Sequence, residues 1–298
     1  MAEALARALR EALPSLEIRE KEPMREHTSF RIGGPAELLL LPGSGEELEE
    51  VCRLLRHWGE KPLILGNGTN VLAPDEGIRG VVVFTKKAGA MSLSGSTLTA
   101  DCGALLTRLS ALAGENALTG LEFAYGIPGT LGGALTMNAG AYGGEMKDVT
   151  ARVDFLDGEL CLRSESGEGL GFGYRRSRFG PGDVILRARL TLREGDAQTI
   201  REKCRELTEK RRASQPLDLP SAGSAFKRPE TGFAAALIDE AGLKGLCVGG
   251  AQVSEKHAGF IVNRGGAAAE DVKRLLELVQ KRVYERSGVR LEPEVRML

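Results

Sequence analysis

Cationic, hydroxyl and aromatic side chains lie beside glycines in the segment "GFGYRRSRF" (171–179). Arg175 and Arg176 carry permanent positive charge, and Tyr174 adds a phenol between them and the glycines. Guanidinium groups bind carboxylates and phosphates, so this segment indicates an anionic ligand. A solvated basic turn remains the alternative, because arginines are common on protein surfaces.

A second cluster of this kind is "SAGSAFKRP" (221–229), in which Ser224 precedes a lysine and an arginine. The sequence has no GxSxG motif, and its three histidines lie in contexts that give no catalytic triad. We therefore expect Ser224 to act as a positioned proton donor rather than as a nucleophile. His27 and His57 are expected on the surface, and His257, in "SEKHAGF", could line a site.

Two glycine-rich stretches expose backbone amides, "LGNGTN" (65–70) and "GIPGTLGGALTMNAGAYGGE" (126–145). Glycine lets successive amides converge on an anion, and two such loops in one half of the chain suggest a dinucleotide. The first loop matches neither GxGxxG nor the P-loop pattern. A tight turn is its alternative, and for residues 132–134 the alternative is a small-residue helix packed on a sheet.

Strands and helices alternate along the first half of the chain. Residues 1–23 read as an amphipathic helix, and 44–60 as a helix capped by Ser44 with Glu47 three residues later. Further strands are expected at 61–66 and 79–85, a helix at 104–117, and mostly strand at 151–193. The second half predicts helices at 197–216, 231–245 and 269–288, a strand within 258–267 and a strand-like tail at 289–298.

Composition limits the partners that this chain of 298 residues can have. The chain has 40 Lys plus Arg and 41 Asp plus Glu, which gives a net charge of -1. This balance gives no reason to expect nucleic acid or an anionic membrane as a partner. The five cysteines are dispersed and contain no CxxC, so we expect no disulfide framework and no metal site. No stretch is apolar enough to span a bilayer. We expect a cytoplasmic protein, with a monomer favoured.

Taken together and in chain order, these segments resemble the UDP-N-acetylenolpyruvoylglucosamine reductase family. The resemblance spans nearly the whole chain, and the ordered set is specific although no single motif decides it. It runs through "HTSFRIGGPAELLLLP", "LGNGTNVL", "GIPGTLGGALTMNAGAYGGE", "GYRRSRF", "SAGSAFKRP", "GFAAALIDEAGLKG", "AQVSEKHAGFIVN" and "EPEV".

The resemblance implies an α+β fold with a vanillyl-alcohol-oxidase-like (PCMH-type) FAD-binding region of two subdomains and a smaller α+β substrate-binding domain. We place the FAD-binding region at 1–195, with subdomains of about 1–70 and 71–195. The substrate-binding domain is then 196–298, and its C-terminal tail returns to the active site.

The two glycine stretches then have a ligand, because side chains would block the close approach of the backbone to FAD. No histidine lies near "LGNGTN", so FAD is expected to bind without a covalent bond. The expected FAD-binding residues are Gly66, Asn67, Gly68, Thr69, Asn70, Gly126, Ile127, Pro128, Gly129, Thr130, Gly132, Gly133, Asn138, Gly140 and Ala141.

The reaction implied is reduction of UDP-N-acetylglucosamine enolpyruvate to UDP-N-acetylmuramate in peptidoglycan synthesis. NADPH reduces FAD, and flavin N5 delivers hydride to C3 of the enolpyruvyl group. Carried over by motif, Arg175 and Glu294 stabilise the charge that develops on the substrate carboxylate, and Glu294 can donate a hydrogen bond to it if burial raises its pKa. Ser224 protonates C2. The expected substrate-binding residues are Tyr174, Arg212, Lys227 and Arg228.

Two departures from the family pattern bear on the substrate site. The family usually has asparagine where this chain has Arg228, which leaves the contact of that residue with the nucleotide open. Only "GPGD" separates Phe179 from the strand at Val184, so the chain resembles the shorter, type II form and lacks an inserted lid. We expect a more open substrate site.

Two other readings compete with this reductase. One is another FAD oxidoreductase of the same fold that oxidises an alcohol or a sugar. It would need a base instead of the carboxylate clamp and acid that Arg175, Glu294 and Ser224 supply. The other is a nucleotide-binding regulatory module that has lost catalysis, which would purify without flavin.

Overall fold

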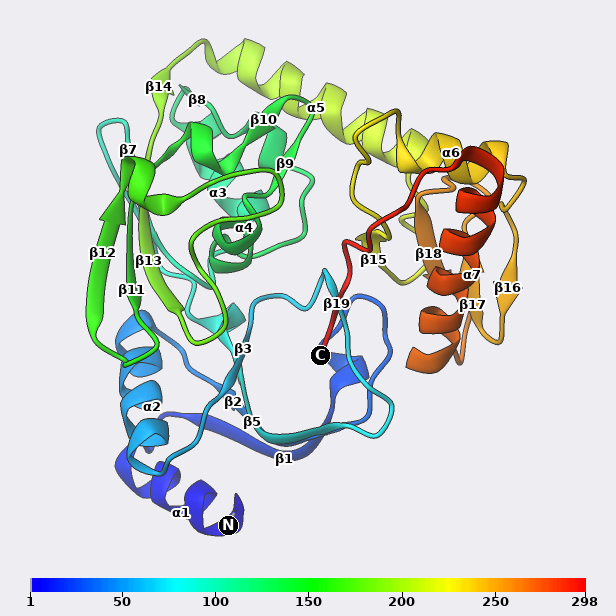
Figure 1. The fold of residues 1–298 in the computed structure, drawn as a ribbon. Helices are drawn as coiled ribbons and strands as arrows, with labels where there is room; N and C mark the ends of the chain where they lie inside the picture. The colour runs from blue at the N-terminus through cyan, green and yellow to red at the C-terminus, as the bar shows by residue number, and fades with distance from the viewer. Residues whose placement is uncertain (1) are drawn as a thin grey trace. The chain divides into compact units, whose positions relative to one another are not determined.

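The structure is a computed structural model that describes residues 2–298, and its chain contributes to two units (Figure 1). The first unit holds the chain up to Glu20 together with Glu37–Asn67 and Gly80–Lys210. The second holds Lys21–Ala36, Gly68–Arg79 and Arg211–Leu298. The predicted boundary at 195/196 divides an FAD-binding region from a substrate-binding domain. The contacts within the chain do not test that division of function, so it stays a prediction. By contacts, the long helix after it belongs mostly to the first unit, and two short N-terminal segments join the second.

A four-stranded sheet is formed by the N-terminal part of the chain, in the order β1-β2-β5-β3. Strands β3 and β5 run parallel. The strands are β1 (Glu17–Pro23), β2 (Pro35–Leu41), β5 (Ile78–Phe84) and β3 (Leu63–Leu65).

Two N-terminal helices test the local sequence signals. Helix α2 (Gly45–His57) begins as predicted, because the Ser44 hydroxyl accepts the Glu47 amide at 3.1 Å. The prediction of one helix over 1–23 is wrong. Helix α1 (Ala2–Ala12) ends just before Pro14, which cannot continue a helix, and the polar residues after it form β1.

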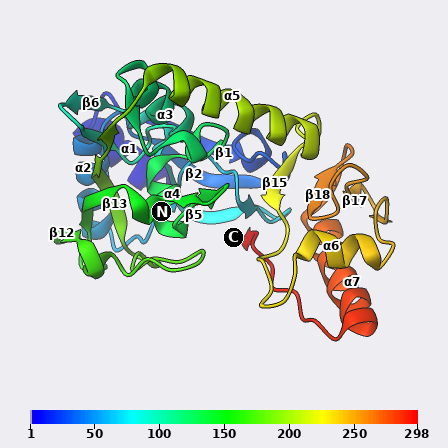
Figure 2. The ribbon, with the colours of Figure 1, turned by 90° about the horizontal axis from the view of Figure 1, so that it is seen from above.

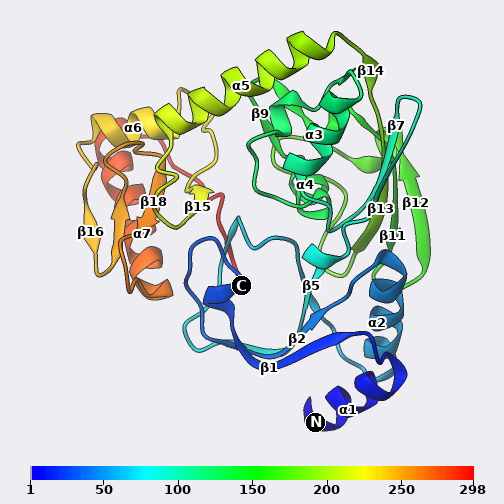
Figure 3. The same cartoon turned by 180° about the vertical axis from the view of Figure 1, so that it is seen from behind.

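The rest of the first unit is built on a five-stranded antiparallel sheet of order β12-β11-β13-β7-β6. The short helices α3 (Leu106–Glu115) and α4 (Leu131–Met137) lie on one face of it (Figure 3). Their apolar side chains and those of the sheet form the core of the unit. The strands are β12 (Leu162–Ser166), β11 (Thr150–Leu156), β13 (Val184–Thr191), β7 (Thr97–Asp101) and β6 (Met91–Ser94).

Short elements complete the first unit. Two pairs of two-residue strands are β8 (Leu118–Thr119) with β14 (Arg193–Glu194), and β9 (Gly140–Ala141) with β10 (Gly144–Glu145). Helix α5 (Ala197–Ser214) follows β14, close to the predicted range. Single 3₁₀ turns occur along the chain at Met24–Glu26, Thr85–Lys87, Glu122–Ala124, Met146–Asp148 and Gly167–Leu170.

The second unit is a four-stranded antiparallel sheet, β15-β18-β17-β16, with helices α6 and α7 on one face (Figure 2). Its strands are β15 (Ser221–Ser224), β18 (Phe260–Asn263), β17 (Ala251–Val253) and β16 (Cys247–Val248), and its helices α6 (Ala234–Glu240) and α7 (Ala269–Ser287). The tail is strand-like only in part, since β19 (Arg296–Met297) pairs in parallel with β4 (Val71–Leu72).

Helix α7 buries one apolar stripe, which includes Val272, Leu275 and Leu276, against this sheet and ends at Gly288 with φ +70°. All five cysteines of the chain are free. Across residues 2–298, no helix is both long and apolar enough to cross a bilayer.

Candidate active site

The two glycine-rich stretches meet in the first unit. The Asn67 side-chain amide donates to the carbonyl of Pro128 at 2.6 Å. A Cβ atom at Gly66 would lie 2.2 Å from Oγ1 of Thr130, so glycine is required there by close packing. Both stretches are predicted to bind one ligand, and these contacts place the ends of the two stretches side by side.

Unpaired polar groups test whether these residues fit a dinucleotide. Within residues 2–298, the backbone amides of the segment 66–70 donate no hydrogen bond, although the segment is buried or half-buried. Thr130 is 1% exposed and its Oγ1 has no partner among those residues either. Among these residues Gly68 and Thr130 are buried, buried polar groups without partners are uncommon in proteins, and a pyrophosphate would satisfy them. The residues present therefore fit FAD.

Other members of the second stretch have a packing reason of their own. The amide of Gly132 donates to the carbonyl of Cys102 at 2.8 Å, and a Cβ atom at Gly132 would lie 3.0 Å from the Cys102 Cβ. This is the small-residue helix packed on a sheet that the sequence left open as an alternative. A contact between Gly132 and FAD stays a prediction.

Asn138 ends helix α4 in the left-handed conformation, with φ +42° and an exposure of 0%. Its Nδ2 donates to Glu145 Oε2 at 2.7 Å and to the carbonyl of Gly173 at 3.0 Å. Its Oδ1 accepts the Lys147 amide at 2.9 Å. Both amide protons of the Asn138 side chain are therefore donated to protein acceptors.

The two candidate arginines lie in a turn. Gly173 and Arg176 exchange backbone hydrogen bonds of 3.0 and 3.2 Å, which leaves Tyr174 and Arg175 at the tip. Arg175 has φ +54°, a conformation that a residue with a side chain rarely adopts. Strain of this kind is a pointer to function.

The turn separates the two arginine side chains. Arg175 is half-buried, and both terminal nitrogens of its guanidinium lie 3.5 Å from the carbonyl oxygen of Gly140 in the glycine stretch. Arg176 is exposed and folds over Gly173. The structure therefore brings Arg175 and the predicted FAD stretch together within one unit.

Ser177 was not singled out from the sequence, yet it fixes the other end of this turn. Its hydroxyl donates to the carbonyl of Thr136 in α4 at 3.0 Å. A serine between two arginines gave no signal for this contact, because the acceptor lies 41 residues away.

Ser224 and Glu294 lie close together along neighbouring backbones of the second unit. The Glu294 amide donates to the carbonyl of Ala225 at 2.9 Å, and Phe226 pairs with Pro293 in an isolated bridge. Gly223, with φ +78°, lies at the irregularity in the pairing of β15 with β18 just before Ser224. An irregularity of this kind redirects the next side chain, and Ser224 is exposed while Glu294 is half-buried.

Asn70 was predicted to bind FAD, and the structure gives its side chain a contact with the tail. Its Nδ2 donates to the carbonyl of Glu294 at 3.1 Å, and its own carbonyl accepts the Arg296 amide at 3.0 Å. Asn70 therefore holds the tail on both sides of Val295. Its backbone amide still belongs to the unpaired segment 66–70.

Two of the predicted substrate cations, Lys227 and Arg228, have partners on the protein. Lys227 forms an ion pair with Glu292, and the Arg228 guanidinium lies 4.3 Å from the centre of the Phe233 ring. Arg212 is an exposed residue near the end of α5. Tyr174 is 54% exposed and packs against the Arg175 guanidinium at 5.3 Å.

His257 and His27 make contacts within the fold. His257 Nδ1 accepts the Gly259 amide at 3.1 Å, and its ring packs against Phe260. Burial lowers the pKa of His257 below its ordinary value, and Lys244 lowers it further. The expectation that His27 lies on the surface is wrong, since its side chain is 10% exposed and paired with Glu22 at 2.8 Å.

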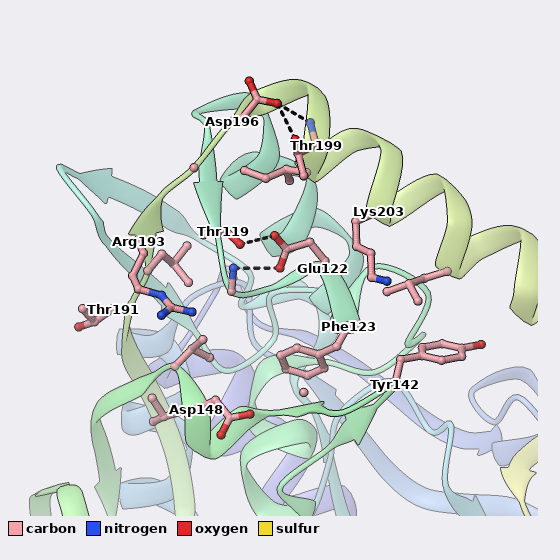
Figure 4. Close-up of a pocket in the computed structure, with 18 of the residues that line it drawn as sticks. Thr119, Glu122, Phe123, Tyr142, Asp148, Thr191, Arg193, Asp196, Thr199 and Lys203 are labelled. Atoms are coloured by element: carbon pink, nitrogen blue, oxygen red, sulfur yellow. Dashed lines mark hydrogen bonds between the residues drawn. The ribbon is translucent and has the colours of Figure 1, made fainter.

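A pocket of about 960 Å³ lies at the start of α5 in the first unit, and none of the predicted site residues lines it (Figure 4). Its carboxylates serve the fold. Glu122 accepts the Thr119 hydroxyl at 2.6 Å and the Gly120 amide at 2.9 Å, and Asp196 accepts the Thr199 amide at 2.7 Å. The free amides of the glycine stretches are a stronger sign of a ligand than this open depression.

Comparison with known proteins bears directly on the family. Residues 215–298 match the family described as UDP-N-acetylenolpyruvoylglucosamine reductase, C-terminal domain, and residues 36–159 match an FAD binding domain. The UDP-N-acetylenolpyruvoylglucosamine reductase of Caldanaerobacter subterraneus subsp. tengcongensis is 47% identical over 299 residues, covering 100% of this chain and 99% of that protein. The protein of that name from Alkaliphilus oremlandii is 47% identical, with 98% of this chain and 97% of that protein covered.

A solved structure supports the same assignment. The crystal structure of UDP-N-acetylenolpyruvylglucosamine reductase from Thermus caldophilus matches with a TM-score of 0.80 and 37% identity, over 95% of this chain and 98% of that one. The predicted family, fold class and FAD cofactor are thereby confirmed. The chain belongs to the UDP-N-acetylenolpyruvoylglucosamine reductase family and is an FAD-dependent oxidoreductase.

Proposed function

We propose that the protein catalyses the NADPH-dependent reduction of UDP-N-acetylglucosamine enolpyruvate to UDP-N-acetylmuramate, acting as a cytoplasmic monomer. FAD held at the two glycine-rich stretches would supply the hydride chemistry that links NADPH to C3 of the enolpyruvyl group. The residues of this chain then control charge and protonation. The identities with curated reductases over nearly the full length support this substrate.

Arg175 supplies fixed positive charge to the substrate carboxylate. The contact of its guanidinium with the Gly140 carbonyl, at 3.5 Å, carries this assignment, because it fixes a cation at the predicted FAD stretch. Charge placed before the reaction stabilises a transition state without further reorganisation. Arg176, exposed and folded away, has no such position.

Ser224 protonates C2, and Glu294 donates a hydrogen bond to the substrate carboxylate. The hydrogen bond from the Glu294 amide to Ala225 supports this pairing of roles, because it holds both residues on adjacent backbones of the second unit. Tyr174, Arg212, Lys227 and Arg228 are proposed to contact the nucleotide part of the substrate. Residues 180–183 form a tight turn in place of a lid, and we propose an open substrate site.

Steady-state kinetics test the reaction as a whole. NADPH oxidation should require the enolpyruvyl substrate and yield UDP-N-acetylmuramate by mass spectrometry, with little consumption of oxygen in its absence. Rapid oxygen consumption with an alcohol or a sugar, and none of this product, would reject the proposal. Alanine variants of Arg175 and Arg176 then assign the catalytic arginine, which would be Arg176 if its variant lost more activity.

A further inference from the structure

We propose that Asn138 is a positioning residue for the reaction, which acts by holding the Gly173–Arg176 turn in the conformation that orients Arg175. The inference rests on the proposed role of Arg175. It assigns to Asn138 a role different from the predicted direct contact with FAD.

The side chain of Asn138 has no amide proton left to donate to a ligand. Both protons of its amide are donated to protein acceptors, Glu145 and Gly173, and its oxygen accepts the Lys147 amide. The residue is 0% exposed. A side chain buried and bonded in this way fixes its neighbours.

The carbonyl of Gly173, which accepts a hydrogen bond from Asn138, lies in the turn that carries Arg175. This carbonyl also accepts the Arg176 amide at 3.2 Å, the bond that closes the turn. Asn138 therefore bonds to the base of the turn that carries Arg175, from a position 35 residues earlier in the chain.

The backbone of Arg175 is in the left-handed region. Its φ of +54° is unfavourable for a residue with a side chain, so surrounding contacts must maintain it. Side-chain bonds that tie this segment to α4 and its end include those of Asn138 with Gly173 and of Ser177 with Thr136. Of these, only Asn138 also bonds to Glu145 beside the Gly140 strand, at 2.7 Å.

Asn138 itself is suited to its backbone conformation, because asparagine tolerates the left-handed region better than most residues. Replacement by glycine keeps that conformation available and removes all three side-chain bonds. Asn138→Asp keeps the volume and the acceptor for Lys147, but loses the donors to both Gly173 and Glu145 and sets its carboxylate against that of Glu145. It is a second variant without the bond to the turn, since aspartate also tolerates the left-handed backbone.

The test uses the full-length protein with FAD and separates the two halves of the reaction by stopped flow. Both variants should reoxidise with the enolpyruvyl substrate about ten- to a hundredfold more slowly than the wild type, as expected for a displaced catalytic group. Reduction by NADPH should stay within about threefold, since Arg175 is not proposed to act there. Asn116→Gly is the matched control, because Asn116 ends α3 and donates only within that helix, to Leu112 at 2.8 Å.

Hydrogen exchange supplies a readout that does not depend on turnover. Amides within 171–179 should exchange faster in Asn138→Gly than in the wild type or Asn116→Gly, because the turn is released. Unchanged exchange and unchanged reoxidation in a folded variant would overturn the inference, as would loss of FAD affinity with normal reoxidation. A wild type that does not react with the substrate would instead defeat the proposed function, and the exchange result would still decide the role of Asn138 in the turn.

Discussion

The backbone amide of Glu294 donates a hydrogen bond of 2.9 Å to the carbonyl of Ala225, the residue that follows Ser224. This bond joins the C-terminal tail to strand β15 and its extension. It places the proposed acid and the proposed carboxylate partner on adjacent backbones, although 70 positions of sequence numbering separate them. A proton donor and a charge-stabilising group are useful together only if one scaffold holds both.

Ser224→Ala and Glu294→Ala should each slow the oxidation of reduced flavin by the enolpyruvyl substrate by about a hundred- to a thousandfold, the usual effect of removing one such donor. Flavin reduction by NADPH should change little. Single-turnover stopped flow measures both steps. Ser166→Ala, a change at an exposed serine of β12, is the control. Equal losses in both half-reactions would mean that the substitutions damage the flavin site instead.

The left-handed backbone of Arg175 predicts a reversal of the usual effect of glycine on stability. Arg175→Gly should be more stable than Arg175→Ala by about 1 kcal/mol, because glycine adopts φ +54° without strain. Both variants should be nearly inactive. At Arg176, whose φ is not positive, glycine should be less stable than alanine by about 0.5–1 kcal/mol. Urea unfolding of the four variants measures this, and the same order at both positions would refute the strain.

The contact between Gly66 and Thr130 predicts a rescue. Gly66→Ala should lower the free energy of unfolding by about 1–3 kcal/mol, because its Cβ would lie 2.2 Å from Thr130 Oγ1. Thr130→Ala in the same chain should restore most of that loss, since the next atom, Cβ of Thr130, is 3.5 Å away.

The matched control for this pair is Gly180→Ala, which meets no atom within 4 Å and lacks a positive φ. Flavin fluorescence titration should show weaker FAD binding in Gly66→Ala, with incomplete recovery in the double variant, because Thr130 is itself a predicted FAD contact. A double variant no more stable than Gly66→Ala would show that the clash lies elsewhere.

His257 predicts a loss of stability in mild acid. Burial lowers its folded pKa below the unfolded value of about 6.5, so the unfolded chain binds more protons between these two values. The contribution of neutral His257 to stability is therefore complete above about pH 6.5 and is lost as the pH falls through the folded pKa.

His257→Asn, which keeps an acceptor for Gly259, should lose less Tm between pH 7 and pH 5 than the wild type does. His57→Asn is the control, since His57 is exposed. Identical pH dependence in the wild type and both variants would assign the acid sensitivity to other groups.

Local signals were read correctly from the sequence where neighbouring residues decide the structure. The cap of α2 by Ser44 and the end of α7 at Gly288 need only residues within one turn of the helix. The predicted first helix is too long, because its amphipathic pattern extends past Pro14, which cannot continue the helix, and the polar residues after it form β1.

Long-range contacts account for what the sequence missed at the site. Asn70 and Glu294 are 224 residues apart, and Asn138 reaches Gly173 across 35. Motifs identified these residues but could not show that they bond to backbone carbonyls. The sequence left a turn at Arg175 open but gave no sign of its left-handed backbone, because that conformation is usually taken by glycine or asparagine.

In the proposed reaction, electrons pass from NADPH through FAD to the enolpyruvyl group. The most direct measurement is anaerobic: the flavin of the purified protein is reduced with NADPH, and its absorbance is followed after addition of UDP-N-acetylglucosamine enolpyruvate. Rapid return of the oxidised flavin spectrum with formation of UDP-N-acetylmuramate is the predicted result. A flavin that stays reduced in the presence of that substrate would contradict the account.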